Sequence, residues 1–343
     1  MRKSLIFVSL ALVASILLAG CGGASAPATT APTNTAAATA TSAPATVAPT
    51  NTAAATATAT AAPATTAPTN TAAATATAAP AASSGTSVVA VAPTSANLSG
   101  DLTLAGSTTV EPLAEALAAA LMKANPGLRI AVQGGGSSVG VKSAGNGTVD
   151  IGTASRELKA DEKSTYPDLQ AFTIARDAIA IVANPGVKPV NLTKDQVRDI
   201  FSGKITNWNQ VGGDDAAIVV VAREEGSGTR AAFEEMVMGK DAAIVNTAIL
   251  QNSNGAVRTT VASTPNSIAF LSLGYLDKSV QPLSINGVLP SLETASNGTY
   301  PIVRPLLYLT KGEPKPLAKA FIDYTLSKEG QDLVKQQGYL PVH

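Results

Sequence analysis

Residues 218–238 read IVVVAREEGSGTRAAFEEMVM, which passes from a β-branched strand through a glycine-serine turn into a helix. A turn of this kind exposes unpaired backbone N–H groups at the start of a helix, where an anion is stabilised. Its glycines let the backbone approach a ligand closely, and its serine and threonine add hydroxyl donors. Arg223, at the end of the strand, adds a guanidinium whose planar donors suit a tetrahedral oxyanion. The stretch therefore predicts an α/β unit that carries an anion-binding turn.

Two further turns of the same composition lie nearer the N-terminus. Residues 106–109 (GSTT) follow a predicted strand and precede a helix, and residues 134–138 (GGGSS) do the same. A single turn of this kind is explained by helix capping alone, because Ser and Thr are favoured N-cap residues. Three turns, spread over the chain and joined by one arginine, instead favour a shared anion site.

Strands alternate with helices along residues 98–343, which predicts a parallel-rich α/β fold. Residues 171–183 form an apolar segment long enough to run from one lobe into another, and residues 267–276 are expected to return. Two crossings create a cleft beyond the carboxyl ends of the strands. The other expected strands are 102–105, 128–133, 149–154, 218–221 and 300–309, and the expected helices are 110–124, 139–145, 193–201 with Thr193 as N-cap, 230–238 and 317–336.

The first residues have the features of a bacterial export signal. Arg2 and Lys3 precede an apolar run from 5 to 18, and residues 18–21 (LAGC) resemble a lipobox. Cys21 is the only cysteine, so no disulfide can form within the chain, and we expect this residue to carry a lipid. An ordinary signal followed by an incidental cysteine is the alternative. The sequence thus predicts a lipoprotein signal peptide at 1–20.

Residues 21–97 predict a lipid-anchored, disordered tether rich in Ala, Thr and Pro. No charged residue occurs between 22 and 100, and the string APTNTAAATAT begins at 31, 48 and 67. These repeats are too short and too poor in large apolar residues to bury a core. The expected lobes are then 98–177 together with 275–343, and 178–274.

Charge and residue counts argue against several functions. Without Arg2 and Lys3 the chain has 22 basic and 24 acidic residues, which does not favour nucleic acid or an anionic membrane surface as a partner. His343 is the only histidine, so with Cys21 assigned to lipid no Ser-His-Asp, Cys-His or histidine-based metal site can be assembled. A carboxylate-only metal site stays open, although no dense Asp motif is present. We therefore expect a protein that is not an enzyme and that needs no cofactor or metal.

Five segments together identify a resemblance. They are 105–112 (AGSTTVEP), 133–142 (QGGGSSVGVK), 149–156 (VDIGTASR), 205–208 (ITNW) and 223–229 (REEGSGT). Over residues 100–343 the chain resembles the phosphate-binding proteins of bacterial ABC phosphate importers, which have the periplasmic-binding-protein type 2 fold. The resemblance implies two lobes with parallel-rich sheets flanked by helices and a ligand in the interlobe cleft. It also implies a monomer that captures inorganic phosphate and delivers it to permease subunits, and with the lipid expected on Cys21 we expect it on the extracytoplasmic face of the cell membrane.

The resemblance further implies a phosphate site built from both lobes. The first lobe is expected to contribute Thr108, Thr109, Ser137 and Ser155, and the second lobe Arg223, Ser227, Gly228 and Thr229. Arg223 is expected to supply the charged contact, with Glu225 orienting it. Arg156 is expected either to add a second positive contact or to form a salt bridge with Glu157, Asp161 or Glu162.

One position departs from the family pattern. Some members place an aspartate in the turn after the third strand, where it accepts the proton of a phosphate oxygen and repels fully ionised sulfate. This chain has Ser155 followed by Arg156 instead. The departure keeps a binding protein for another oxyanion, such as sulfate, molybdate or tungstate, as an alternative. A surface sensor or adhesin built on the same fold is a second alternative, which the long tether would suit.

Overall fold

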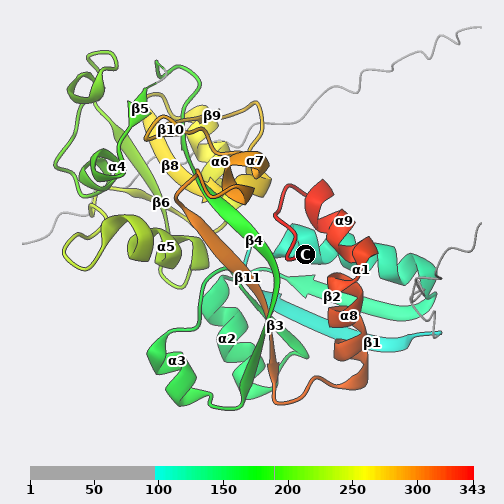
Figure 1. Cartoon of the computed structure of the whole chain (residues 1–343). Helices are drawn as coiled ribbons and strands as arrows, with labels where there is room; N and C mark the ends of the chain where they lie inside the picture. Colours follow the sequence, from blue (N-terminus) through cyan, green and yellow to red (C-terminus); the bar gives the residue numbers. More distant parts are fainter. Residues whose placement is uncertain (1–96, 189) are drawn as a thin grey trace, which may run out of the picture. The chain divides into compact units, whose positions relative to one another are not determined.

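The computed structural model describes residues 97–188 and 190–343 (Figure 1). All of them lie in one unit, Ser84–His343. The predicted signal peptide, the lipidation site at Cys21 and nearly all of the predicted tether fall outside the described residues. None of the described helices has the length and apolar character of a membrane span.

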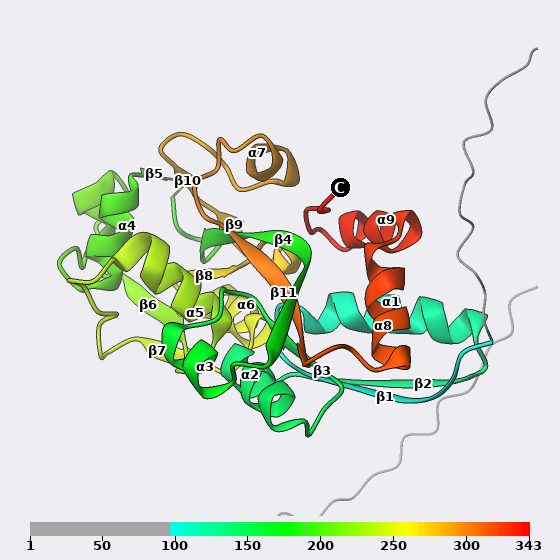
Figure 2. The same cartoon turned by 60° about the horizontal axis from the view of Figure 1, so that its bottom comes forward.

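The first lobe is a parallel sheet with helices on both faces (Figure 2). Its strands pair in the order β2-β1-β3. The helices α1, α8 and α9 cover one face, where Leu104, Leu113 and Phe321 share a core, and α2 covers the other face with Val141 and Ala144. The elements are β1 (Ser99–Gly106), α1 (Glu111–Ala124), β2 (Gly127–Gln133), α2 (Ser137–Asn146), β3 (Ile151–Ala154), α3 (Ala160–Thr165), α8 (Pro316–Leu326) and α9 (Lys328–Gln336).

Two long antiparallel strands connect the lobes. The strands β4 (Leu169–Ala183) and β11 (Val303–Lys311) run side by side through the middle of the molecule in both views (Figures 1 and 2). The first part of β4 pairs with β11 beside the first lobe, and residues 179–183 pair with β8 of the second lobe. The expected parallel groups are therefore present at the two ends of one continuous sheet, with antiparallel strands between them.

The second lobe is built around a shorter sheet, in which β6 pairs in parallel with β7 and β8. Aromatic rings pack in its core: Phe233 stacks on Phe270 with centroids 4.2 Å apart, and Phe201 is tilted against Phe233 with centroids 4.7 Å apart. Thr193 caps α4 as expected, since its hydroxyl accepts a hydrogen bond from the Gln196 N–H at 3.1 Å. The elements are β5 (Asn191–Leu192), α4 (Lys194–Phe201), a 3₁₀ turn (Trp208–Val211), β6 (Val219–Arg223), α5 (Gly228–Phe233), a π-helical turn (Glu234–Met238), β7 (Ile249–Gln251), α6 (Asn254–Ser263), β8 (Ser267–Ser272), a 3₁₀ turn (Leu273–Tyr275), β9 (Gln281–Pro282), β10 (Ser284–Ile285) and α7 (Leu292–Ser296).

The return to the first lobe differs from the sequence expectation. Residues 267–272 form β8, which stays in the second lobe between β4 and β6, and the chain returns only on β11. Residues 281–302, expected in the first lobe, also lie in the second, because β9 pairs with β4 and β10 with β5. Tyr300 is in the core of the second lobe, where its hydroxyl donates to the Ile179 carbonyl at 2.8 Å. An apolar run is typical of any buried central strand, so its composition could not identify the lobe.

The expected final helix at 317–336 is two helices. Ser327 ends α8 and begins α9, and its hydroxyl accepts a hydrogen bond from the Gly330 N–H at 3.2 Å. A serine that caps a new helix competes with continuation of the old one, which explains the break.

Candidate functional site

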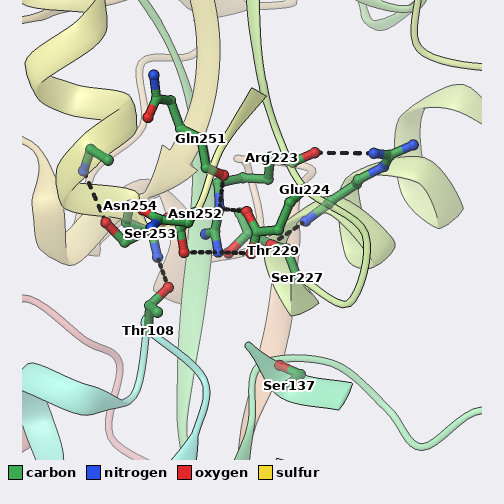
Figure 3. Close-up of polar contacts among 12 residues, drawn as sticks. Thr108, Ser137, Arg223, Glu224, Ser227, Thr229, Gln251, Asn252, Ser253 and Asn254 are labelled. Atoms are coloured by element: carbon green, nitrogen blue, oxygen red, sulfur yellow. Dashed lines mark hydrogen bonds and ion pairs between the residues drawn. The ribbon is translucent and has the colours of Figure 1, made fainter. Parts of the chain in front are cut away.

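The three glycine-serine turns meet between the lobes. Figure 3 shows Thr108 and Ser137 of the first lobe facing Ser227 and Thr229 of the second. The hydroxyl oxygens of Thr109 and Thr229 lie 3.2 Å apart, within hydrogen-bond distance across the cleft. The structure thus brings together polar groups that are 120 positions apart in the chain.

Glycines make the close approach of the turns possible. The Ser138 N–H donates across the cleft to the Gly226 carbonyl at 3.1 Å. Gly136 and Gly226 have φ angles of 93° and 86°, a left-handed conformation that side chains disfavour. A Cβ on Gly136 would also lie 3.0 Å from the Gly226 carbonyl oxygen. The turn sequences therefore permit both the backbone conformation and the contact between lobes.

Gly228 touches the first lobe directly. A Cβ at this position would collide with the hydroxyls of Ser137 and Ser155. These two serines are linked, because the Ser155 N–H donates to Ser137 Oγ at 3.0 Å and the two hydroxyl oxygens are 3.4 Å apart. Ser227, the residue before, caps α5 by accepting a hydrogen bond from the Arg230 N–H at 3.2 Å. The start of α5 is thus held against the hydroxyls of the first lobe.

Arg223 is buried, with 1% of its surface exposed, and one of its terminal nitrogens has no partner. Its Nε and Nη2 donate to the Glu224 carboxylate at 3.0 and 2.9 Å. The same nitrogens donate to the carbonyls of Gln251 and Asn252 at 3.1 and 3.2 Å. Nη1 is left with its hydrogens unsatisfied, which is costly inside a protein unless a ligand accepts them. The guanidinium is therefore oriented, and its free edge is available to an anion.

Glu224 orients Arg223, where the sequence predicted Glu225. The carboxylate next to the strand end reaches back to the guanidinium, while Glu225 is exposed and lines a cavity at the edge of the cleft. Two adjacent glutamates in a turn cannot be told apart by composition, because only the backbone conformation decides which one points inward.

Arg156 forms a salt bridge with Glu162, which was one of its two expected roles. Its two terminal nitrogens lie 2.7 Å from the two carboxylate oxygens, and Nη1 also donates to the Glu157 carbonyl at 2.9 Å. Nη2 donates to the Ser138 hydroxyl at 3.1 Å, and Nε is buried without a partner. With both terminal nitrogens bonded to Glu162, Arg156 has only Nε left without a partner, whereas Arg223 keeps a terminal nitrogen free.

Asn254 and Arg304 are site residues that the sequence interpretation missed. Asn254 is the first residue of α6, and its Nδ2 donates to Thr109 Oγ1 at 2.9 Å. Arg304 lies on β11 beside Asp177 of β4, and its Nη2 donates to the same oxygen at 3.0 Å. Charged residues inside otherwise apolar strands were the available signal for Arg304 and Asp177, and the polar run 252–255 after a short strand was the signal for Asn254.

The hydroxyls predicted to bind a ligand are closed off from solvent. Thr109, Ser155 and Thr229 are each 1% exposed and Ser137 is fully buried. Beside them an open cavity of about 380 Å³ lies between α2, α3 and α5, and Arg156, Lys159 and Arg230 are among the residues that line it. Within residues 97–188 and 190–343, no group of three or more His, Cys, Asp or Glu side chains is placed to hold a metal ion. The site as a whole offers N–H and O–H donors, which suits an anion.

Comparisons with known proteins identify the family and the fold. A family described as PBP superfamily domain matches residues 60–329. The chain is 39% identical over 249 residues to "Phosphate-binding protein PstS" of Bacillus subtilis (strain 168), covering 71% of this chain and 81% of that protein. It is 32% identical over 253 residues to the protein of the same name from Borreliella burgdorferi, covering 70% of this chain and 90% of that protein.

Two solved structures share the fold. One is a putative phosphate ABC transporter substrate-binding protein with bound phosphate from Clostridium perfringens, with a TM-score of 0.69, 39% identity, and coverage of 71% of this chain and 100% of that chain. The other is an ABC-type phosphate transport receptor from Vibrio cholerae, with a TM-score of 0.59, 36% identity, and coverage of 70% and 99%.

Proposed function

The chain belongs to the PBP superfamily and, within it, to the PstS-type phosphate-binding proteins, and from this premise we propose that it captures inorganic phosphate outside the cytoplasm and delivers it to an ABC importer. The observation that carries the proposal is the unpaired, buried Nη1 of Arg223, together with the meeting of hydroxyls from both lobes at Thr109 and Thr229. The relatives are named as binding and transport proteins, which supports a binding role rather than an enzymatic one.

The proposed ligand set takes donors from both lobes. Arg223 supplies positive charge, and a charge-assisted hydrogen bond to a phosphate oxygen is worth about 1.5–3 kcal/mol. The N–H groups at the start of α5 add donors at the positive end of a helix. The proposed phosphate-binding residues are Thr108, Thr109, Ser137, Ser155, Arg223, Ser227, Gly228 and Thr229, with Arg156 as a more distant positive group at the edge of the cleft.

Closure of the lobes follows from this division of donors. Neither lobe alone surrounds an anion, so a bound phosphate would gain its full set of hydrogen bonds only in the closed arrangement. The cross-cleft contacts Thr109–Thr229 and Ser138–Gly226 are consistent with such closure. Because the chain carries almost no net charge, capture depends on this local geometry rather than on a general electrostatic field.

Another oxyanion is a second candidate ligand, and one observation favours it. The carboxylates of Glu162 and Glu224 are each paired with an arginine, and Glu225 is exposed at the edge of the cleft. A site that rejects sulfate with a carboxylate acceptor would need an unpaired carboxylate among the buried hydroxyls. Discrimination would then depend on hydroxyl oxygens, which can accept as well as donate.

The test is calorimetric titration of the mature chain with phosphate, sulfate and tungstate at about pH 7. We expect heat of binding with phosphate and clearly weaker binding of sulfate. Absence of phosphate binding, or equal affinity for sulfate, would overturn the phosphate assignment.

Membrane attachment through Cys21 and contact with permease subunits are the remaining parts of the proposal. The lipobox-like residues 18–21 support attachment. A Cys21→Ser chain should leave the membrane fraction of expressing bacteria, whereas the wild-type chain should remain in it. Equal distribution of the two chains would refute lipid anchoring at this residue.

A further inference from the structure

We propose that Asn254 and Arg304 are positioning residues, which fix the Thr109 hydroxyl as a hydrogen-bond donor to the bound anion. The inference rests on the proposed function and concerns residues that do not themselves need to touch the ligand. It follows from counting the donors and acceptors around one oxygen atom.

Asn254 can only donate to Thr109. The backbone N–H of Ser272 donates to Asn254 Oδ1 at 3.2 Å, and an N–H group has no capacity to accept. This contact fixes which end of the side-chain amide is the oxygen. The amide nitrogen therefore faces Thr109 Oγ1, which it reaches at 2.9 Å, with a longer contact of 3.4 Å to Thr108 Oγ1.

Arg304 can also only donate to Thr109, because a guanidinium has no acceptor. Its Nε and Nη2 donate to Oδ2 of Asp177 at 3.1 and 2.8 Å, and the Ser272 hydroxyl donates to the other oxygen, Oδ1, at 2.9 Å. These contacts hold the guanidinium plane, so that Nη2 is also placed 3.0 Å from Thr109 Oγ1.

The Thr109 hydroxyl must then donate its own hydrogen. A hydroxyl oxygen has two lone pairs, and here Asn254 and Arg304 engage both. The one neighbour placed to receive the hydrogen among the hydrogen bonds of the described residues is Thr229 Oγ1, 3.2 Å away in the opposite lobe. An anion oxygen between the lobes is a stronger acceptor than a hydroxyl, so a bound phosphate would take this hydrogen bond.

The burial of the ion pair supports a role beyond stability. Arg304 is 2% exposed and Asp177 is fully buried, and both lie on the strands that join the lobes. Burial raises the pKa of the Asp177 carboxyl, while Arg304 and Ser272 act in the opposite direction. Buried ion pairs are weak sources of stability, because apolar residues of similar size often serve as well. Orientation of the Thr109 hydroxyl explains why a buried ion pair lies on the strands that join the lobes.

A double-mutant cycle tests the inference. In the full chain, Thr109→Val removes the hydroxyl with little change of shape, and Asn254→Ala removes one of its donors. We expect each single change to weaken phosphate binding by about tenfold to a hundredfold in calorimetric titration. In the Thr109→Val background, Asn254→Ala should add less than about threefold, because the hydroxyl that it orients is gone.

A matched variant at another buried asparagine serves as the control. Asn125→Ala makes the same change as Asn254→Ala at a buried asparagine whose side chain, among the described residues, bonds Leu98 and Leu121 of the first lobe, and it should lower thermal stability without changing affinity.

The outcomes separate this inference from the proposed function. If Asn254→Ala weakens binding equally in both backgrounds, or not at all, then Asn254 does not act through Thr109 and the inference is wrong while phosphate binding stands. If the wild-type chain binds no phosphate, both fail. Arg304→Lys, which keeps a charged donor, should retain more affinity for phosphate than Arg304→Met. The reverse order would show that Arg304 does not orient the Thr109 hydroxyl.

Discussion

Replacing Gly228 with alanine should separate folding of the second lobe from closure of the two lobes. Gly228 is the first residue of α5 and does not have a positive φ, so the helix itself accepts alanine. Within helices, Ala is favoured over Gly by about 0.5–1 kcal/mol. We therefore expect the Gly228→Ala chain to fold with a melting temperature equal to or above that of the wild type in the absence of phosphate.

Closure should be impaired because the added Cβ meets the opposite lobe. It would collide with Ser137 Oγ and lie 2.6 Å from Ser155 Oγ. The Ser137 hydroxyl cannot rotate away without losing its hydrogen bond from the Ser155 N–H at 3.0 Å. Relief requires a separation of about 1.0–1.5 Å between the lobes, since ordinary contact begins near 3.5 Å. That movement would break the hydrogen bonds from Thr109 to Thr229 and from Ser138 to Gly226 across the cleft.

The expected loss of affinity follows from these contacts. Two hydrogen bonds and the strain of overpacking together amount to about 2–4 kcal/mol, which corresponds to about 30-fold to 1,000-fold weaker phosphate binding. Calorimetric titration measures the affinity, and small-angle scattering with and without phosphate measures closure through the radius of gyration. The variant should remain expanded at phosphate concentrations that compact the wild type.

Gly255→Ala is the matched control. Gly255 is the second residue of α6, also in the second lobe, and the nearest atoms to its added Cβ would be 3.8 and 3.9 Å away. It should gain helix stability and bind phosphate as the wild type does. The reasoning would be refuted if Gly228→Ala bound phosphate as tightly as Gly255→Ala, because contact between α5 and the serines of the first lobe would then be irrelevant to binding.

Three other predictions follow from single contacts. Arg223→Ala should weaken phosphate binding by at least about a hundredfold and Arg156→Ala by less than about tenfold, because Arg223 keeps a buried terminal nitrogen free whereas both terminal nitrogens of Arg156 are bonded to Glu162, and the opposite order in titration would reverse their roles. Asp150→Asn should lower the free energy of unfolding by about 1 kcal/mol at neutral pH. Burial acts to raise the pKa of Asp150, but hydrogen bonds, of which that from Lys315 is the strongest, bring this pKa below its usual value. A carboxyl whose pKa is lowered by folding stabilises the protein at pH values above its unfolded pKa of about 3.9, and this contribution is lost as the pH falls through the folded pKa. A difference in denaturant unfolding between the variant and the wild type that persisted at about pH 2 would contradict this explanation. Thr193→Ala should cost about 1 kcal/mol through loss of the α4 cap, and an unchanged melting temperature would exclude a capping role.

Local features of the sequence were sufficient to predict most elements and the composition of the turns. Each glycine-serine turn lies between a strand and a helix as expected, and Thr193 caps α4. These features depend on backbone conformations and hydrogen bonds among residues a few positions apart, which residue type controls directly. The resemblance to phosphate-binding proteins was confirmed by the comparisons, because its motifs are these same local turns.

The sequence did not decide which carboxylate pairs with each arginine. Glu224 rather than Glu225 orients Arg223, and Arg156 forms the salt bridge with Glu162 that was one of its two expected roles. Both outcomes depend on the direction in which a side chain leaves the backbone, which composition does not specify.

Tertiary structure alone decided the polar network around Thr109 and the lobe to which residues 281–302 belong. Thr109 and Arg304 are 195 positions apart. The ion pair between Asp177 on β4 and Arg304 on β11 can be recognised only once those strands are paired. The sequence by itself therefore determined that this protein carries several glycine-serine turns whose composition suits an anion. Strand pairing over long separations decided that the turns meet at one place, because the pairing is fixed by packing of the whole sheet rather than by any short segment.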